Sequence, residues 1–238
     1  PQVTPFVVHM VLTVVAAVLV WNVPETQPPA SGPRPSRPLV PAVARTSRFF
    51  WVVAAWAPWV FGTATIAFAS IPSFLLSTVR WPVAYLGVVA AAVMFTGVLV
   101  QPLAARLAGH GWLPLSVTGL GAASVGLVLG ALTVTWHSSW LAVPTAVVLG
   151  VSYGFMMVAG LREVELMARP HELGALIGVF YTLTYTGFAV PFVLSLVAPA
   201  VARWAGVEPT TGFVWCLLFG VLVCAASAVP VARAAARG

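Results

Sequence analysis

Long apolar runs alternate with short polar breaks along most of the chain. A membrane-spanning helix needs about 20 mostly apolar residues, and seven runs meet that requirement. The predicted spans are residues 5–23, 49–71, 82–103, 113–135, 140–161, 173–197 and 211–231. The pattern therefore predicts an all-α membrane protein with seven transmembrane helices.

The breaks between the predicted spans are unequal, and the first is by far the longest. It contains the run PPASGPRPSRP, whose prolines lack backbone donors and resist helix formation. We therefore expect a linker at residues 24–48. It separates one helix at residues 1–23 from a group of six closely spaced helices at residues 49–238.

The arginines predict the orientation of the spans. All eleven basic residues are arginine, and alternate breaks must lie on opposite sides of the membrane. One side receives nine arginines and the other receives only Arg80 and Arg203. Because cytoplasmic loops carry the excess of positive charge, we expect the linker and the C-terminus to be cytoplasmic in a multi-pass protein of the plasma membrane.

The amino-acid composition limits the surroundings and the binding partners that the chain can have. The chain is 61% hydrophobic and 7% charged, whereas soluble domains are about 25% charged, so a lipid bilayer must be its solvent. The net charge of +6 comes from arginines scattered between apolar runs, which argues against a nucleic-acid partner. Cys216 and Cys224 lie eight residues apart in one span, about 12 Å on a helix, so they cannot form a disulfide. We predict no metal and no cofactor.

Titratable side chains are rare in the spans. None of the five glutamates lies in the middle of a predicted span, although a buried carboxylate is the usual proton carrier of a transporter. If transport is proton-coupled, we expect the coupling group outside this piece. His9, inside the first span, has a structural or interfacial interpretation and a functional one.

Three stretches carry a resemblance to a known family. They are VWNVPET (20–26), QPLAARLAGHG (101–111) and LREVELMARPHELGALIGVFYTLTYTGFAVPF (161–192). On these stretches the chain resembles the major facilitator superfamily and looks like an actinobacterial-type member of its drug-efflux branch. The resemblance covers the sixth span, the central loop and the C-terminal six spans of such a transporter.

The second stretch resembles a degenerate copy of the family's loop motif G-x-L-A-D-R-x-G-R. Leu103, Ala104 and Arg106 match the motif, whereas Gln101 replaces its first glycine and Ala105 its aspartate. Loss of the aspartate removes the charge relay that the motif makes. Arg106 is retained as a candidate gating residue.

The resemblance implies a fold of one helix plus a six-helix half-bundle, with an N-terminal half missing from this piece as its partner. It also implies alternating access about a site near the bilayer midplane, with the second, third, fifth and sixth spans of this chain facing the cavity. Residues 1–23 would be the last helix of the N-terminal half.

Aromatic and polar side chains on those spans are the candidates for contact with a small-molecule substrate. An uncharged surface of this kind suits a hydrophobic or weakly polar organic molecule. The predicted substrate-binding residues are Trp56, Trp59, Thr63, Tyr85, Tyr153, Met157, Tyr181 and Tyr185. Tyr181 and Tyr185 share a helical face with Phe188, and we expect Trp56, Tyr153 and Tyr181 to line one cavity. Helix packing is the alternative for each residue.

Two further patterns concern helix ends and helix contacts. Arg162 and Glu165, at i and i+3, are expected to pair at the cytoplasmic end of the fifth span, either as a gate or as part of a solvated loop. Gly150 with Gly154, and Gly174 with Gly178, form small-xxx-small rows that let helices approach closely.

The sequence thus favours the C-terminal part of a secondary active transporter of small organic solutes, working as an efflux permease and not as an enzyme. A non-transporting membrane scaffold or subunit, and an intramembrane enzyme, are the alternatives.

Overall fold

The computed structural model describes residues 3–24, 39–108 and 114–235. Contacts between residues divide the chain into two units, Pro1–Pro38 and Leu39–Gly238. Within the described residues, seven helical segments are long and apolar enough to cross a membrane, which confirms the predicted spans. Most of the predicted linker, residues 25–38, lies outside the described residues.

The first unit contains one helix, α1 (Thr4–Trp21). Pro5 occupies its first turn, where the missing backbone donor costs nothing because the first four N–H groups of a helix have no partner within it. Its 18 residues extend about 27 Å at 1.5 Å per residue, close to the thickness of the hydrocarbon core of a bilayer.

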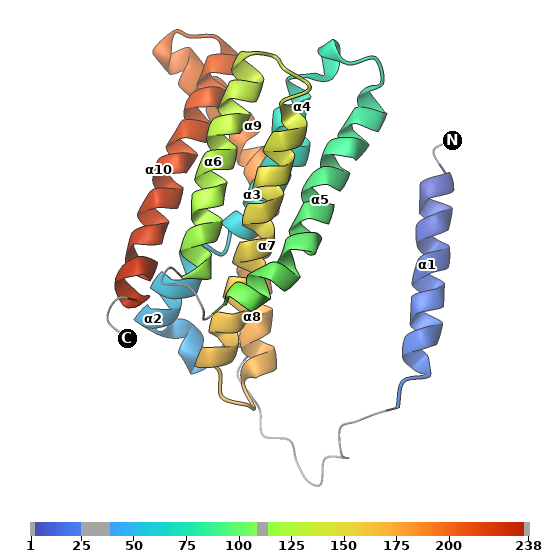
Figure 1. Ribbon diagram of the computed structural model, residues 1–238, viewed down its shortest axis with the longest axis vertical. Coiled ribbons are helices and arrows are strands. Elements are labelled where there is room, and N and C mark those ends of the chain that lie inside the picture. The colour runs from blue at the N-terminus through green and yellow to red at the C-terminus, as the bar shows by residue number, and fades with distance from the viewer. Residues whose placement is uncertain (1–2, 25–38, 109–113, 236–238) are drawn as a thin grey trace. The chain divides into compact units, whose positions relative to one another are not determined.

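Four long helices form the frame of the second unit. They are α5 (Pro82–Leu107), α6 (Leu115–Thr135), α7 (Ala142–Met167) and α10 (Pro209–Ala235). Helix α7 lies between α5 and α6, and α6 also contacts α10 (Figure 1). The frame is therefore a row of neighbouring helices in which α7 makes the central contacts.

The first crossing segment of this unit, residues 47–73, is an irregular helix. Its π-helical stretches add a residue per turn, and Pro58 has no N–H to donate. The segment consists of α2 (Ser47–Phe49), η2 (Phe50–Ala54, π), α3 (Trp59–Thr65), η3 (Ile66–Ser70, π) and α4 (Ile71–Ser73). Short 3-10 turns flank it, η1 (Ala42–Arg45) before and η4 (Leu76–Thr78) after.

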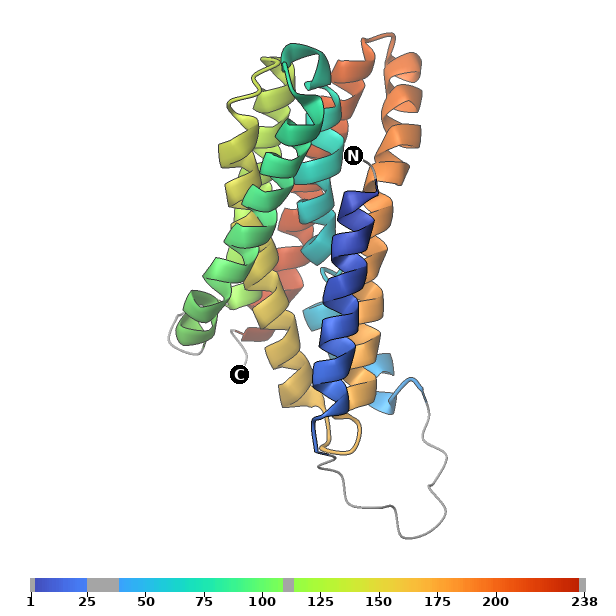
Figure 2. The same ribbon diagram turned by 90° about the vertical axis from the view of Figure 1, so that its right-hand side faces the viewer.

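The remaining crossing segment, residues 173–205, is also interrupted. Helix α8 (Leu173–Tyr185) passes into a 3-10 turn, η5 (Thr186–Ala189), and then into α9 (Val190–Ala205). Figure 2 shows α8 and α9 following one another along the bundle. Gly206 ends α9 with φ of 67°, the left-handed conformation that favours glycine after a helix.

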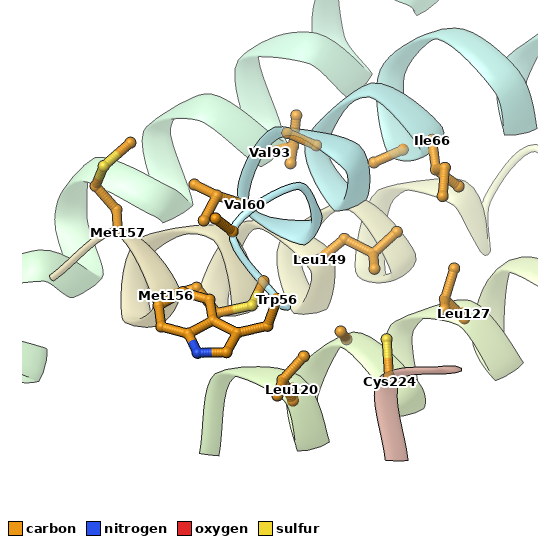
Figure 3. Close-up of a cluster of buried hydrophobic side chains, with 14 of the residues drawn as sticks. Trp56, Val60, Ile66, Val93, Leu120, Leu127, Leu149, Met156, Met157 and Cys224 are labelled. Carbon is orange, nitrogen blue, oxygen red and sulfur yellow. The ribbon is translucent and has the colours of Figure 1, made fainter. Parts of the chain in front are cut away.

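The interior is apolar and is built where the irregular first segment meets the frame. Trp56 lies among Val60, Leu120 and Met156 (Figure 3), and all four are fully or almost fully buried. The glycine row on α7 allows α5 to approach closely, since a Cβ at Gly150 would stand 2.6 Å from the carbonyl oxygen of Val93. The predicted packing role of Gly150 and Gly154 is thus confirmed.

Three details of the sequence prediction are wrong. Residues 162–167, expected in a loop, are the last turns of α7, and α9 continues to Ala205, beyond the predicted end at 197. Apolar content locates the membrane core, but a helix continues past it wherever the residues favour helix and their charges reach water. The glycine row at Gly174 and Gly178 makes no close contact, because a Cβ at either position would meet nothing within 4 Å.

Candidate functional site

Five aromatic side chains from three separate segments meet on the second unit. We call them the aromatic cluster: Phe61 from α3, Tyr153 from α7, Tyr181 and Tyr185 from α8, and Phe188 from η5. Phe61 is its centre. The Phe61 ring stacks on Tyr185 at a centroid distance of 5.3 Å and on Phe188 at 4.8 Å, and it lies 5.5 Å from Tyr153.

The rings on the outer side of the cluster are open. Tyr185 lies 6.0 Å from Tyr181 and 6.0 Å from Phe188, which confirms that the three share a face. Tyr185 is 55% exposed and Phe188 49% exposed. The cluster therefore presents flat aromatic faces and edges of the kind that stack with other rings.

Tyrosine hydroxyls supply the polar part of this surface. The hydroxyl of Tyr153 interacts electrostatically with that of Tyr181 and with that of Tyr185. Among the described residues, none of these three hydroxyls makes a hydrogen bond. They remain available as neutral donors and acceptors beside the stacked rings.

Close backbone contacts hold the cluster in place. Tyr153 covers Gly97 of α5, where a Cβ would stand 2.0 Å from its ring. On the opposite side, Gly62 of α3 meets Gly187 of η5, and the Thr65 hydroxyl donates a hydrogen bond to the Gly187 carbonyl at 3.1 Å. The cluster thus depends on two glycines, Gly97 and Gly187, at which a Cβ would overlap a neighbouring segment.

The structure separates the eight predicted substrate-binding residues into groups. Tyr153, Tyr181 and Tyr185 lie in the aromatic cluster, and their contact with a substrate stays a prediction. Trp56, Thr63 and Met157 are instead buried side chains of the interior. The indole N–H of Trp56 donates to the Val52 carbonyl, and the Thr63 hydroxyl donates to the Val60 carbonyl at 3.3 Å. The expectation that Trp56 shares a cavity with Tyr153 and Tyr181 is wrong, because its side chain is 0% exposed.

The two other predicted residues lie elsewhere. Trp59 borders a cavity of about 380 Å³ between the first crossing segment, α6, α9 and α10. Its walls are apolar and include Leu127, Leu217 and Phe219. Tyr85, near the start of α5, donates a hydrogen bond to the Ser139 carbonyl at 3.2 Å and so ties α5 to the turn between α6 and α7.

The sequence prediction missed Phe61, the central ring of the cluster. A regular helix places Trp56, Trp59 and Thr63 on one face, and Phe61 is not on that face. The sequence could have indicated Phe61 as the aromatic residue of α3 that lies outside the face of Trp56, Trp59 and Thr63.

The predicted gating residues lie at the end of the bundle where α2 begins. Arg106 is in the last turn of α5, and Arg162 and Glu165 are on the final turns of α7, all three exposed. Within the described part of the chain, Arg162 and Glu165 form no ion pair. The acid that interacts with Arg162 is Glu163, which is half-buried and also interacts with Arg48 of α2. This electrostatic attraction acts between the start of the first crossing segment and α7, without an ion pair among the described residues.

Comparison with known proteins identifies the family. Residues 3–191 match the sequence profile of the Major Facilitator Superfamily. A search of curated proteins and a search of solved structures found no significant match. Because the match covers well over half of the chain, and because seven apolar helices accompany it, the chain belongs to the Major Facilitator Superfamily. It is a multi-pass membrane protein of a transporter family whose members bind small-molecule substrates within the membrane.

Proposed function

We propose that this chain is the C-terminal part of an efflux permease for small, neutral, aromatic organic molecules, and that the aromatic cluster is its substrate-contact surface. The observation that carries the proposal is the meeting of Phe61, Tyr153 and Tyr185 from three different helical segments, with open ring faces and unpaired hydroxyls. Exposed aromatic side chains such as Phe192 also occur elsewhere on the bundle, and the cluster differs from them because its rings come from three segments and contact one another.

The chemistry of the surface favours weak and reversible binding. Each aromatic pair contributes about 0.5–1.5 kcal/mol beyond area burial, so a planar solute that stacks on Phe61 or Tyr185 gains enough affinity to be held but not trapped. The hydroxyls of Tyr153 and Tyr181 orient a carbonyl, hydroxyl or amide of the solute. A strongly charged solute would find no counter-ion among the cluster residues.

Transport follows from alternating access in our proposal. The helices of residues 49–238 form one half, and residues 1–23 are the last helix of the other half, which supplies the rest of the site. The arginine-rich end of the bundle faces the cytoplasm of a plasma-membrane protein. Arg106, Arg162 and Glu165 line the gate at that end, and proton coupling, where present, uses a group on the other half.

Flux measurements on the full-length protein in liposomes test the proposal. We expect gradient-driven movement of a planar aromatic dye, and we expect Phe61→Ala to raise KM about tenfold, the effect of about 1.4 kcal/mol. Phe192→Ala is the matched control, because Phe192 is a 66% exposed phenylalanine of α9 outside the cluster. Equal KM values for the two variants, or no gradient-driven flux of any aromatic solute, would contradict the proposal.

A further inference from the structure

The backbones of α3 and η5 touch beside the aromatic cluster. A Cβ at Gly187 would stand 2.4 Å from the Gly62 nitrogen, 2.4 Å from the Pro58 carbonyl oxygen and 3.0 Å from the Phe61 carbonyl carbon. An ordinary carbon–oxygen contact needs about 3.3 Å. Since every obstructing atom is backbone, no side chain can move aside, and only glycine fits at position 187.

The Thr65 hydroxyl lies between the two touching segments. It is 3.1 Å from the Gly187 carbonyl and 3.0 Å from the Gly62 carbonyl of its own helix, so its single proton is shared between the two acceptors. Both carbonyls belong to the two touching glycines, and Thr65 is almost fully buried. The hydroxyl therefore links α3 to η5 where water is excluded, and it determines how one segment is placed along the other.

The rings of the cluster are attached directly to this contact. Phe61 directly precedes Gly62 in the chain, and Phe188 directly follows Gly187. Tyr185 lies two residues before Gly187. The same rings form the two closest stacks of the cluster, Phe61 with Phe188 at 4.8 Å and with Tyr185 at 5.3 Å. Any separation of the backbones at Gly187 is thus transmitted to both stacks.

We infer that Gly187 and Thr65 are positioning residues, which set the spacing of Phe61 from Tyr185 and Phe188 and thereby the substrate affinity of the surface. The inference rests on the proposed function for its effect on affinity, but its effect on ring geometry is independent of that function. Neither residue contacts the substrate in this scheme; both act through the rings.

The first experiment measures ring geometry in the full-length protein by 19F NMR, with 3-fluorotyrosine incorporated site-specifically at position 185 or at position 85. Tyr85 lies outside the cluster, bonds to Ser139 and serves as the reference. We expect Gly187→Ala to shift the Tyr185 resonance and to leave that of Tyr85 in place. Gly174→Ala, a matched change on α8 where a Cβ meets nothing within 4 Å, should shift neither.

The second experiment measures transport by the same full-length variants. We expect Gly187→Ala to raise KM for the aromatic dye about tenfold, as for one misplaced methyl group in a binding site, with kcat largely retained. Thr65→Val should shift the Tyr185 resonance and raise KM in the same direction as Gly187→Ala. Thr65→Ser, which keeps the hydroxyl, should leave both quantities at the values of the unmodified protein. The threonine variants keep the test valid if the alanine variant fails to fold.

Two results would overturn the inference. One is a Tyr185 resonance unmoved in both Gly187→Ala and Thr65→Val, which would show that the contact does not position the ring. The other is a moved resonance with unchanged KM, which would show that ring spacing does not set affinity. Failure of the proposed function gives a different result, because Phe61→Ala itself would then leave KM unchanged.

Discussion

Replacement of Gly150 by alanine tests the central contact of the bundle, between α5 and α7. The new methyl carbon would stand 2.6 Å from the Val93 carbonyl oxygen and 2.9 Å from the Thr96 Cβ. Ordinary contact with the oxygen requires about 3.3 Å, so the helices must separate locally by about 0.7 Å. A gap of that size forfeits a quarter to a half of the dispersion energy of each contact it opens.

The expected cost follows from two opposing effects. Overpacking a well-packed interior costs about 1–3 kcal/mol. Alanine in place of glycine within a helix contributes about 0.8–1 kcal/mol in the other direction. Gly121→Ala on α6 isolates the second effect, because a Cβ there meets nothing within 4 Å. We therefore expect Gly150→Ala to be less stable than Gly121→Ala by about 1–3 kcal/mol.

Thermal unfolding in detergent, followed by tryptophan fluorescence, provides the measurement. Both variants are compared with the unmodified protein under one condition, so that the difference between them reports the helix contact alone. Should Gly150→Ala unfold at the same temperature as Gly121→Ala, the helices have room for the methyl group, and the close approach deduced from the glycine row is refuted.

Two further predictions concern buried polar and sulfur groups. The hydroxyls of Thr133 and Thr145 lie 2.9 Å apart between α6 and α7, and each also lies within hydrogen-bond distance of a carbonyl of its own helix. Because these carbonyls are alternative acceptors, a double-mutant cycle with valine should give a coupling energy of only about 0.6 kcal/mol. A coupling energy above about 2 kcal/mol would contradict this prediction. Cys216 borders the cavity beside Trp59, whereas Cys224 on the same helix is fully buried. A small membrane-permeant thiol reagent should therefore modify the Cys224→Ala protein, which keeps Cys216, several-fold faster than the Cys216→Ala protein, which keeps Cys224. Equal rates would count against an open cavity.

The sequence predicted the spans well because their signal is the sum of about twenty residues. A single charged or polar residue does not change that sum, so all seven segments appear in the structure. Helix ends are less secure, because the last turns of α7 carry Arg162, Glu163 and Glu165 and still remain helical. Charge marks where the membrane ends, and not where the helix ends.

The candidate site was predicted only in part, for a geometric reason. Tyr181, Tyr185 and Phe188 follow one another through α8 and η5, and the spacing of a regular helix was sufficient to place them on one face. The first crossing segment carries aromatic residues on more than one face: Trp56 lies with Thr63 in the interior, whereas Phe61 lies in the cluster. Helical spacing groups residues by face but does not say which face meets the site, so the prediction chose the face of Trp56 in place of that of Phe61.

The π-helical stretch η2 has a consequence for how this segment tolerates insertions and deletions. It lies between Arg48, which interacts with Glu163 of α7, and Phe61, the central ring of the cluster. One residue corresponds to a rotation of about 100° around a helix axis. Loss of a single residue from η2 would therefore turn Arg48 away from α7 or Phe61 away from the other rings, even though no side chain named in either contact had been altered. The length of this short stretch keeps an electrostatic attraction at one end of the second unit in phase with an aromatic contact near its middle, and length changes there should be tolerated far less readily than substitutions.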